Sequence, residues 1–195
     1  MKASSKVIQI HYEDLPVGVD DRGIDLMASH RSYGYLSKPL IDSLVELFKG
    51  SRVVECYSGR GLLASLLKEK GVDIRSTSLR MGHDGSDSLG HVTDVDDCSV
   101  LEALQRYGSV MDYLLVCWPV SDESLCRALA YLPMHVPIVF IGEVTDYQAK
   151  PAFLGGCASD HFFESVMESV QMTARLAYPT PRMDKIKVYL RAPAP

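Results

Sequence analysis

The stretch VVECYSGRGLL, residues 53–63, predicts a buried strand that breaks sharply into a helix. Two β-branched residues, Val53 and Val54, lead into a polar turn that contains Gly59 and Gly61. Leucines then recur at helical spacing up to Lys70. Glycines in such a turn let the backbone approach a ligand closely, and the free N–H groups at the helix start favour negative charge. A nucleotide-like ligand is therefore expected at this turn.

The same stretch leaves two cofactors open. Its spacing Gly59-x-Gly61-x-x-Ala64 fits a form of the dinucleotide fingerprint, so a nicotinamide cofactor is weighed against S-adenosylmethionine. Class I methyltransferases carry an acidic residue at the end of this strand, and Glu55 resembles it. Tyr57 stands where their first glycine usually stands, so its phenol ring either narrows the pocket or packs over it.

Length, composition and charge indicate a single globular domain. The chain has 195 residues, of which 47% are hydrophobic, and this predicts one domain around one substantial core. The formal net charge is −5 and the basic residues are scattered, so the sequence carries no electrostatic footprint for nucleic acid. No apolar run follows residues 1–6, and no run of about 18 apolar residues occurs. We therefore expect a cytoplasmic protein without a membrane partner.

Cysteine and histidine give no sign of a metal site. The five cysteines include no CxxC pair and sit mostly in apolar segments, which is typical of reduced thiols in a core. The six histidines form no H-E-x-x-H or other ligand spacing. We expect no structural metal.

The first 30 residues are ambiguous and are interpreted as an extension or lid ahead of a domain spanning 31–195. Val7, Ile8 and Ile10 suggest a short strand, and residues 20–23 suggest a turn. The domain then opens with a helix that Ser37 caps and that ends at Gly50.

The second strand, residues 72–79, completes a right-handed βαβ unit with the first strand and its helix. Adenosylmethionine and NAD sites both place an Asp or Glu at the end of this strand, where it accepts hydrogen bonds from ribose hydroxyls. Here Ser78 takes that position. Because Arg80 lies close by, the gap also suits the 2′-phosphate of NADP.

Residues 91–95 predict a short third strand with Asp94 at its carboxyl end, where a side chain can reach the adenine of an adenosyl ligand. The alternative is that Asp94, Asp96 or Asp97 caps the following helix, which begins near Val100. The sequence leaves both roles open.

Two further predicted strands end in residues that could take part in binding or catalysis at the same edge of the sheet. Residues 110–117 predict a central strand that ends in Cys117-Trp118-Pro119, and residues 136–143 predict a fifth strand that ends in Glu143. Ligands of open α/β sheets bind beyond the carboxyl ends of the strands. Cys117 is interpreted as a packed thiol beside the site, because the nucleophilic cysteines of pyrimidine methyltransferases follow the proline. Glu143 either acts as a base or caps the next segment.

The C-terminal quarter predicts a helix and a closing hairpin. Asp160 is expected to cap a helix that extends to Val170. Strands near residues 171–177 and 185–191, joined by a proline-bearing turn, form the hairpin.

From about Tyr33 to Arg191 the chain resembles small class I methyltransferase-like proteins whose fourth strand ends in a Trp-Pro motif. The matching elements are Tyr33–Ser37, Glu55–Gly61, Leu114–Pro119, Gly142-Glu143, Gly155–Cys157 ahead of Phe162-Phe163, and Asp184–Arg191. The resemblance implies an α/β, Rossmann-like class I methyltransferase fold, with a mostly parallel seven-stranded sheet and a C-terminal β-hairpin. It implies no particular methyl acceptor.

The sequence thus favours an S-adenosylmethionine-dependent methyltransferase. Trp118 and Glu143 are expected on the acceptor side, and Gly61→Asp is expected to abolish cofactor binding without loss of the fold. One alternative is a noncatalytic scaffold on a degenerate methyltransferase fold, which Tyr57 and Ser78 favour. The other is an NADP-linked oxidoreductase. The residues expected at the cofactor are Glu55, Tyr57, Gly59, Gly61, Ser78, Asp94 and Cys117.

Overall fold

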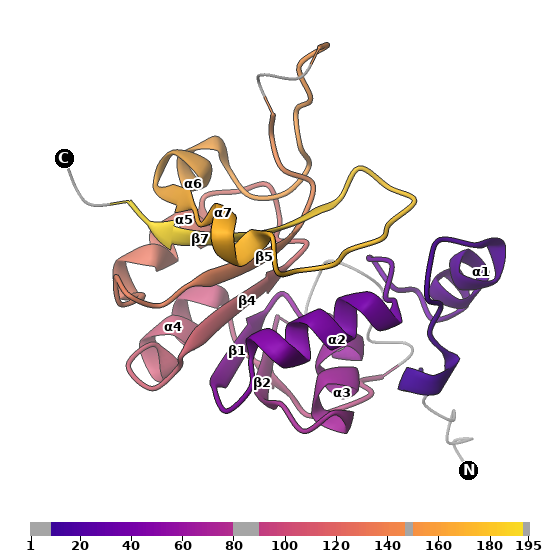
Figure 1. The fold of residues 1–195 in the computed structure, drawn as a ribbon. Helices are drawn as coiled ribbons and strands as arrows, with labels where there is room; N and C mark the ends of the chain where they lie inside the picture. Colours follow the sequence, from indigo (N-terminus) through magenta and orange to yellow (C-terminus); the bar gives the residue numbers. More distant parts are fainter. Residues whose placement is uncertain (1–8, 80–89, 147–149, 193–195) are drawn as a thin grey trace.

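A seven-stranded sheet forms the centre of the molecule (Figure 1). The computed structural model describes residues 9–79, 90–146 and 150–192. The strand order is β3-β2-β1-β4-β5-β7-β6, and β7 runs antiparallel to both of its neighbours. This confirms the predicted mostly parallel α/β sheet with a C-terminal hairpin. The strands are β1 Arg52–Cys56, β2 Asp73–Ser78, β3 Val95–Asp97, β4 Tyr113–Cys117, β5 Ile138–Gly142, β6 Val166–Glu168 and β7 Lys185–Arg191.

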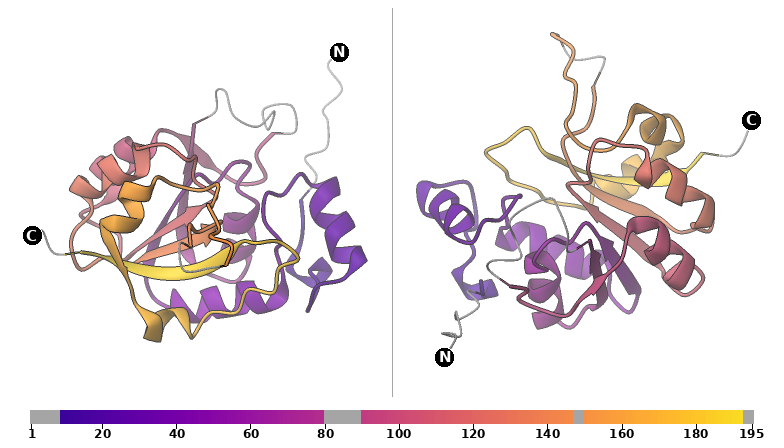
Figure 2. Two further views of the ribbon diagram at one scale, coloured as in Figure 1. Left: turned by 90° about the horizontal axis from the view of Figure 1, so that it is seen from above. Right: turned by 180° about the vertical axis from the view of Figure 1, so that it is seen from behind.

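Helices cover both faces of the sheet. Helices α2, α3 and α7 lie on one face and α4, α5 and α6 on the other, while α1 lies beside these layers (Figures 1 and 2). The helices are α1 Asp21–Ser29, α2 Lys38–Leu47, α3 Leu62–Glu69, α4 Val100–Tyr107, α5 Ser124–Ala128, α6 Asp160–Glu164 and α7 Val170–Thr173. Two single 3₁₀ turns, Tyr12–Asp14 and Leu129–Tyr131, complete the described elements.

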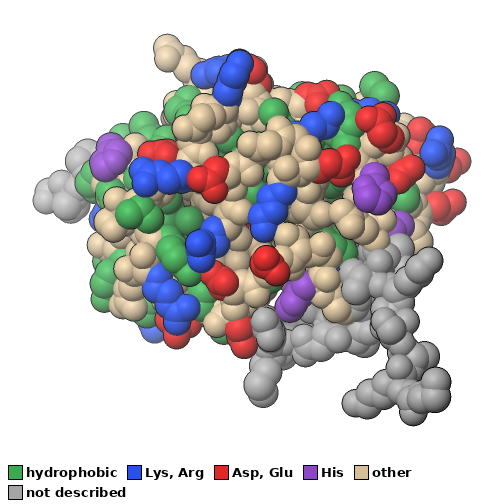
Figure 3. Space-filling view, turned by 90° about the horizontal axis from the view of Figure 1, so that it is seen from below, with side chains coloured by type: hydrophobic (Ala, Val, Ile, Leu, Met, Phe, Trp, Pro, Cys, Tyr) green, Lys and Arg blue, Asp and Glu red, His purple; other side chains and the backbone are tan. Residues whose placement is uncertain are grey.

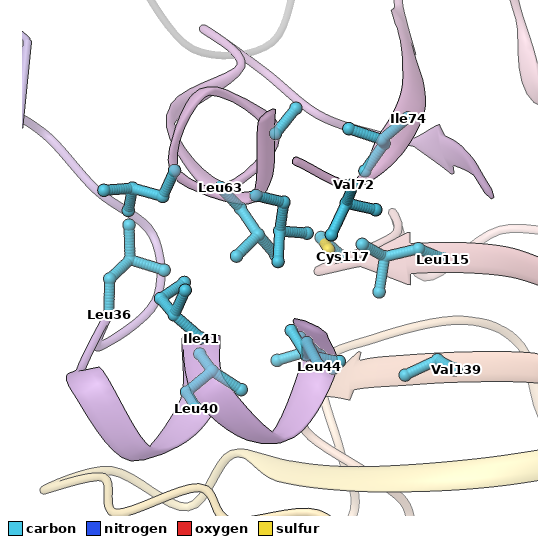
Figure 4. Close-up of a cluster of buried hydrophobic side chains, with 14 of the residues drawn as sticks. Leu36, Leu40, Ile41, Leu44, Leu63, Val72, Ile74, Leu115, Cys117 and Val139 are labelled. Carbon is cyan, nitrogen blue, oxygen red and sulfur yellow. The ribbon is translucent and has the colours of Figure 1, made fainter. Parts of the chain in front are cut away.

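Alternation along the central strands builds two cores, one on each face. In β1, Val53 belongs to the core under α2 and α3, whereas Val54 belongs to the core under α4 and α5. In β4, Leu115 belongs to the first of these cores and Leu114 to the second. A parallel strand covered on both faces needs apolar residues in both directions, which explains its continuous apolar sequence. Figure 4 shows the first of these cores, between α2, α3 and the strands.

The start of α2 is as predicted, and the start of α4 is not. Ser37 caps α2, because its side chain accepts a hydrogen bond from Leu40 N. Ser99 caps α4 in a reciprocal capping box with Glu102, so the alternative in which an aspartate caps this helix is wrong. Asp94 precedes β3 rather than ending it, and the prediction that it lies at the carboxyl end of that strand is also wrong.

The C-terminal hairpin forms earlier in the sequence than predicted. The first hairpin strand is β6, and Val170–Thr173 is helix α7, so the predicted strand at 171–177 is wrong. Helix α6 is short and is capped by Ser159 rather than Asp160. It stops because Val166 and the two residues after it pair with β7, and that pairing stabilises the extended backbone more than a further helical turn would.

The N-terminal segment is helical where a turn was expected. The Asp20 side chain accepts a hydrogen bond from Gly23 N at 2.6 Å, which makes Asp20 the cap of α1. Ile10 is buried but lies outside any strand, and Val7 and Ile8 fall outside the described residues.

Figure 3 shows one face of the surface, where Lys and Arg side chains alternate with Asp and Glu and form no large patch of one sign. Among the helices of the described residues, none is long and apolar enough to cross a membrane.

Candidate functional site

A cavity of about 1040 Å³ lies at the carboxyl ends of the parallel strands. Its walls include Glu55 and Tyr57 at the end of β1, Ser78 at the end of β2, Trp118 after β4 and Glu143 after β5. This is the edge at which open α/β sheets bind their ligands. The volume is sufficient for a nucleoside-sized ligand together with a second small molecule.

Seven of the nine predicted site residues line this cavity, and two do not. Those that line it are Glu55, Tyr57, Gly59, Ser78, Cys117, Trp118 and Glu143. Asp94 is outside the lining because the third strand begins after it, and the residues that follow that strand, 98–100, take its place. Gly61 is also outside the lining.

The two glycines of the turn have different neighbours. A Cβ on Gly61 would lie 2.7 Å from Thr93 Cγ2, in a backbone with φ of +78°, so Gly61 allows close packing against the segment before β3. The expectation that Gly61→Asp spares the fold therefore conflicts with the structure. A Cβ on Gly59 would meet no described atom within 4 Å. Gly59 is the glycine of this turn that faces the cavity.

Glu55 is a buried carboxyl group with a raised pKa. Ser76 Oγ donates to Glu55 Oε2 at 3.0 Å, and the Cys117 thiol is a second donor. Desolvation outweighs these hydrogen bonds and raises the pKa of Glu55 to about 7. Burial and the nearby Glu55 also raise the pKa of Cys117 well above its ordinary value. The Cys117 thiol is therefore protonated at neutral pH, which agrees with a packed thiol and not with a nucleophile.

The raised pKa of Glu55 predicts a pH-dependent contribution to stability. The folded state holds this proton more tightly than the unfolded state, so the stabilisation is present below pH 4.5 and is lost as the pH rises through about 7. The shift corresponds to roughly 3 kcal/mol. We expect the free energy of unfolding of wild type to fall relative to Glu55→Gln between pH 5 and 8, measured by urea denaturation. A constant difference across this range would contradict the assignment.

Three non-glycine residues that line the cavity have a left-handed backbone. Arg31 has φ of +49°, Tyr57 has φ of +60° and Trp118 has φ of +46°. Such conformations cost free energy and are concentrated at functional sites. The Tyr57 hydroxyl lies 2.8 Å from Ser124 Oγ, which holds the ring toward the start of α5, and burial raises the pKa of the phenol.

Trp118 connects the N-terminal segment to a buried carboxylate. Its ring packs on Gly34, where an added Cβ would lie 1.8 Å from Cη2. Its Nε1 has no hydrogen-bond partner with acceptable geometry among the described residues, although the N–H is near enough to Asp184 to lower the pKa of that carboxyl. Burial has the larger effect and raises the pKa of Asp184 overall.

Asp184 is a cavity residue that sequence reasoning did not assign. It precedes β7, whose first residue Lys185 is paired with Gly142 of β5. The antiparallel register therefore places Asp184 beside Glu143. No local sequence signal could reveal this, because the two residues are brought together by the insertion of β7 between β5 and β6.

The loop after β5 holds Glu143 in place. Gly156 N donates to Glu143 Oε2 at 3.0 Å. Cys157 follows on the cavity wall, and burial raises the pKa of its thiol. A hydrogen bond with the backbone of Glu143 opposes this rise, whereas the charges of Glu143 and Asp184 add to it. These effects place the three side chains within electrostatic range of one another.

Comparison with solved structures identifies this architecture. A point mutant of the nicotianamine synthase MtNAS shares 13% identity with a TM-score of 0.55, over 91% of this chain and 67% of that one. The same mutant in complex with S-adenosylmethionine gives a TM-score of 0.52 at 13% identity, over 91% of this chain and 69% of that one. An O-methyltransferase family protein from Burkholderia thailandensis gives 0.50 at 14% identity, over 90% of this chain and 61% of that one. This chain has the class I methyltransferase fold.

These comparisons show the fold of the chain and do not assign it to a protein family. No family model and no curated protein matches the sequence. The chain spans about two thirds of the length of the MtNAS structures. Arg80, which kept the NADP interpretation open, lies outside the described residues.

Proposed function

We propose that the protein is an S-adenosylmethionine-dependent methyltransferase. The observation that carries the proposal is that Gly59 lines the cavity at the carboxyl end of β1, beside the buried Glu55, with no described atom within 4 Å of where its Cβ would lie. A side chain at Gly59 would fill that space, so the turn provides a backbone surface for a ligand. MtNAS, which shares the fold, has been solved in complex with S-adenosylmethionine.

The residues around the cavity fit the parts of such a cofactor. Gly59 would face its amino acid portion, and the hydroxyl of Ser78 at the end of β2 would reach its ribose. Residues 98–100, after β3, would border its adenine. When bound, S-adenosylmethionine supplies an electrophilic methyl group. The chain itself aligns the reactants and excludes water, which is most of what a methyl transfer requires.

The acceptor side of the cavity is the part that Trp118, Glu143 and Asp184 line. The carboxylates there can orient an acceptor and take up its proton. Glu143 is fixed by Gly156 N, and the hydroxyl of Tyr178 donates to Asp184 Oδ2 at 3.3 Å.

We further propose that the segment up to residue 30 serves as a lid over this site. Arg60 fixes its end, because Arg60 Nη1 donates to the carbonyl of His30 at 3.0 Å. Just after the segment, Arg182 Nη1 donates to the carbonyl of Tyr33. Residues 31–33 line the cavity directly after it. The segment 174–184, drawn in yellow in Figure 1, extends toward this lid and brings Arg182 to Tyr33, just after it.

Calorimetric titration with S-adenosylhomocysteine tests the cofactor assignment, with NADPH and adenosine as parallel ligands. We expect micromolar binding of S-adenosylhomocysteine and much weaker binding of the other two. Binding of NADPH alone would replace the proposal with the oxidoreductase alternative. Binding of none of the three would mean that Tyr57 and Ser78 close the pocket, and the scaffold interpretation would take over.

A further inference from the structure

One end of the cavity gathers two carboxylates around a single indole. We call this end the acidic compartment and define it by Trp118, Glu143, Gly156, Cys157, Arg182 and Asp184, all of which line the cavity. Glu143 comes from the end of β5 and Asp184 from the start of β7, so the pairing of these two strands fixes their separation. The two carboxylates are therefore positioned by the pairing of β5 with β7.

Both carboxylates are held by neutral donors. Glu143 receives the N–H of Gly156, and Asp184, which is 6% exposed, receives the hydroxyl of Tyr178. Neutral hydrogen bonds orient a carboxylate but do not cancel its charge. Arg182 is the cation of the compartment, and its guanidinium is directed to the Tyr33 carbonyl. Two anions thus face one cation.

The excess of negative charge in the compartment determines which ligand charge it favours. An anionic ligand would be repelled by Glu143 and Asp184, and a neutral ligand would cover them without compensating their charge. A protonated amine would pair with both carboxylates through charge-assisted hydrogen bonds. Trp118 adds an aromatic surface of the kind that attracts cations best.

We propose that the acidic compartment binds a protonated amine, so that the substrate of this site is a small cationic amine. That this amine is the methyl acceptor rests on the function proposed above. That the compartment binds an amine does not depend on that function. Asp184 and Glu143 are the residues that recognise the ammonium group.

The experiment uses the fluorescence of Trp118, because it is the one tryptophan of the chain. The protein is titrated with cyclohexylmethylamine, and with cyclohexylmethanol and cyclohexanecarboxylate as neutral and anionic probes of similar shape. Each titration is made with and without saturating S-adenosylhomocysteine. We expect the amine to bind at least about tenfold more tightly than either analogue, in both conditions.

Isosteric variants locate the site. Asp184→Asn and Glu143→Gln keep an oxygen for the Tyr178 hydroxyl and the Gly156 N–H, and each is expected to weaken amine binding about tenfold. Asp122→Asn is the matched control, because Asp122 lines the same cavity outside the compartment and accepts from Ser124 N at 2.8 Å. It is expected to bind the amine like wild type. An unchanged urea denaturation curve shows that each variant is folded.

The outcomes separate this inference from the proposed function. Equal affinity for amine and alcohol, or amine binding that Asp184→Asn and Glu143→Gln leave unchanged, would overturn the amine site even if S-adenosylhomocysteine binds. Competition between S-adenosylhomocysteine and the amine would overturn it too, since the compartment would then belong to the cofactor. Selective amine binding without any binding of S-adenosylhomocysteine would support the amine site and refute the methyltransferase.

Discussion

Replacing Gly59 by Asp is expected to lower the affinity for S-adenosylhomocysteine by about 100-fold, or roughly 2.7 kcal/mol, without unfolding the protein. A Cβ at this position would meet no described atom within 4 Å, and Gly59 lines the cavity, so the added side chain is expected to enter it. Its carboxylate would then lie beside the carboxylate of the ligand's amino acid portion, which the N–H groups at the start of the helix are expected to hold. Calorimetric titration of the variant measures the loss.

The backbone of Gly59 sets the control for this experiment. Its φ is +54°, a left-handed conformation that Asn and Asp tolerate better than other side chains. Gly59→Asn therefore imposes a similar strain and a similar volume without the charge, and it is expected to lose clearly less affinity than Gly59→Asp. Equal losses for the two variants would show that the turn does not face a carboxylate. Full binding by both would refute the placement of the cofactor.

Gly34→Ala is expected to destabilise the protein by about 1–3 kcal/mol and to change the emission of Trp118. The added Cβ would lie 1.8 Å from Cη2 and 1.9 Å from Cζ2 of the indole, so the ring must move. The conformation of Gly34 is not left-handed, and the clash with Trp118 is thus the source of the effect. Because Trp118 lines the cavity, ligand affinity is expected to fall as well.

A second glycine, Gly18, tests whether this effect is specific. An added Cβ on Gly18 would meet no described atom within 4 Å, and Gly18 has no positive φ. Gly18→Ala is expected to change the free energy of unfolding by less than about 0.5 kcal/mol. Urea denaturation and tryptophan emission of the two variants give the comparison. Equal stability of both would mean that the indole does not pack on Gly34.

The helices and strands whose predicted positions are confirmed are those that short-range sequence patterns specify. Residues 52–56 and 62–69 form the strand and helix expected from the apolar run, the glycine turn and the leucine spacing. Ser37 caps α2 because a serine ahead of an early proline satisfies the free N–H groups at a helix start within one turn of chain. These interactions require no knowledge of distant residues.

The errors fall where a partner strand decides the structure. Residues 166–168 are extended because β7 pairs with them, although their apolar spacing also fits a helix. The third strand starts at Val95 because Ser76 of β2 is its first partner, which leaves Asp94 ahead of the strand. Periodicity reports which side chains are apolar, but strand pairing sets where the backbone becomes extended.

The sequence by itself determined the α/β class, the turn at Gly59 and the edge of the sheet where Glu55, Trp118 and Glu143 meet, since each follows from short-range spacing and from the rule that parallel strands share one carboxyl edge. The tertiary structure alone decided that Gly59 rather than Gly61 faces the cavity, and that Asp184 stands beside Glu143. The first depends on packing against Thr93, and the second on a strand inserted from the far end of the chain. Both are contacts between residues distant in sequence, which local spacing does not encode.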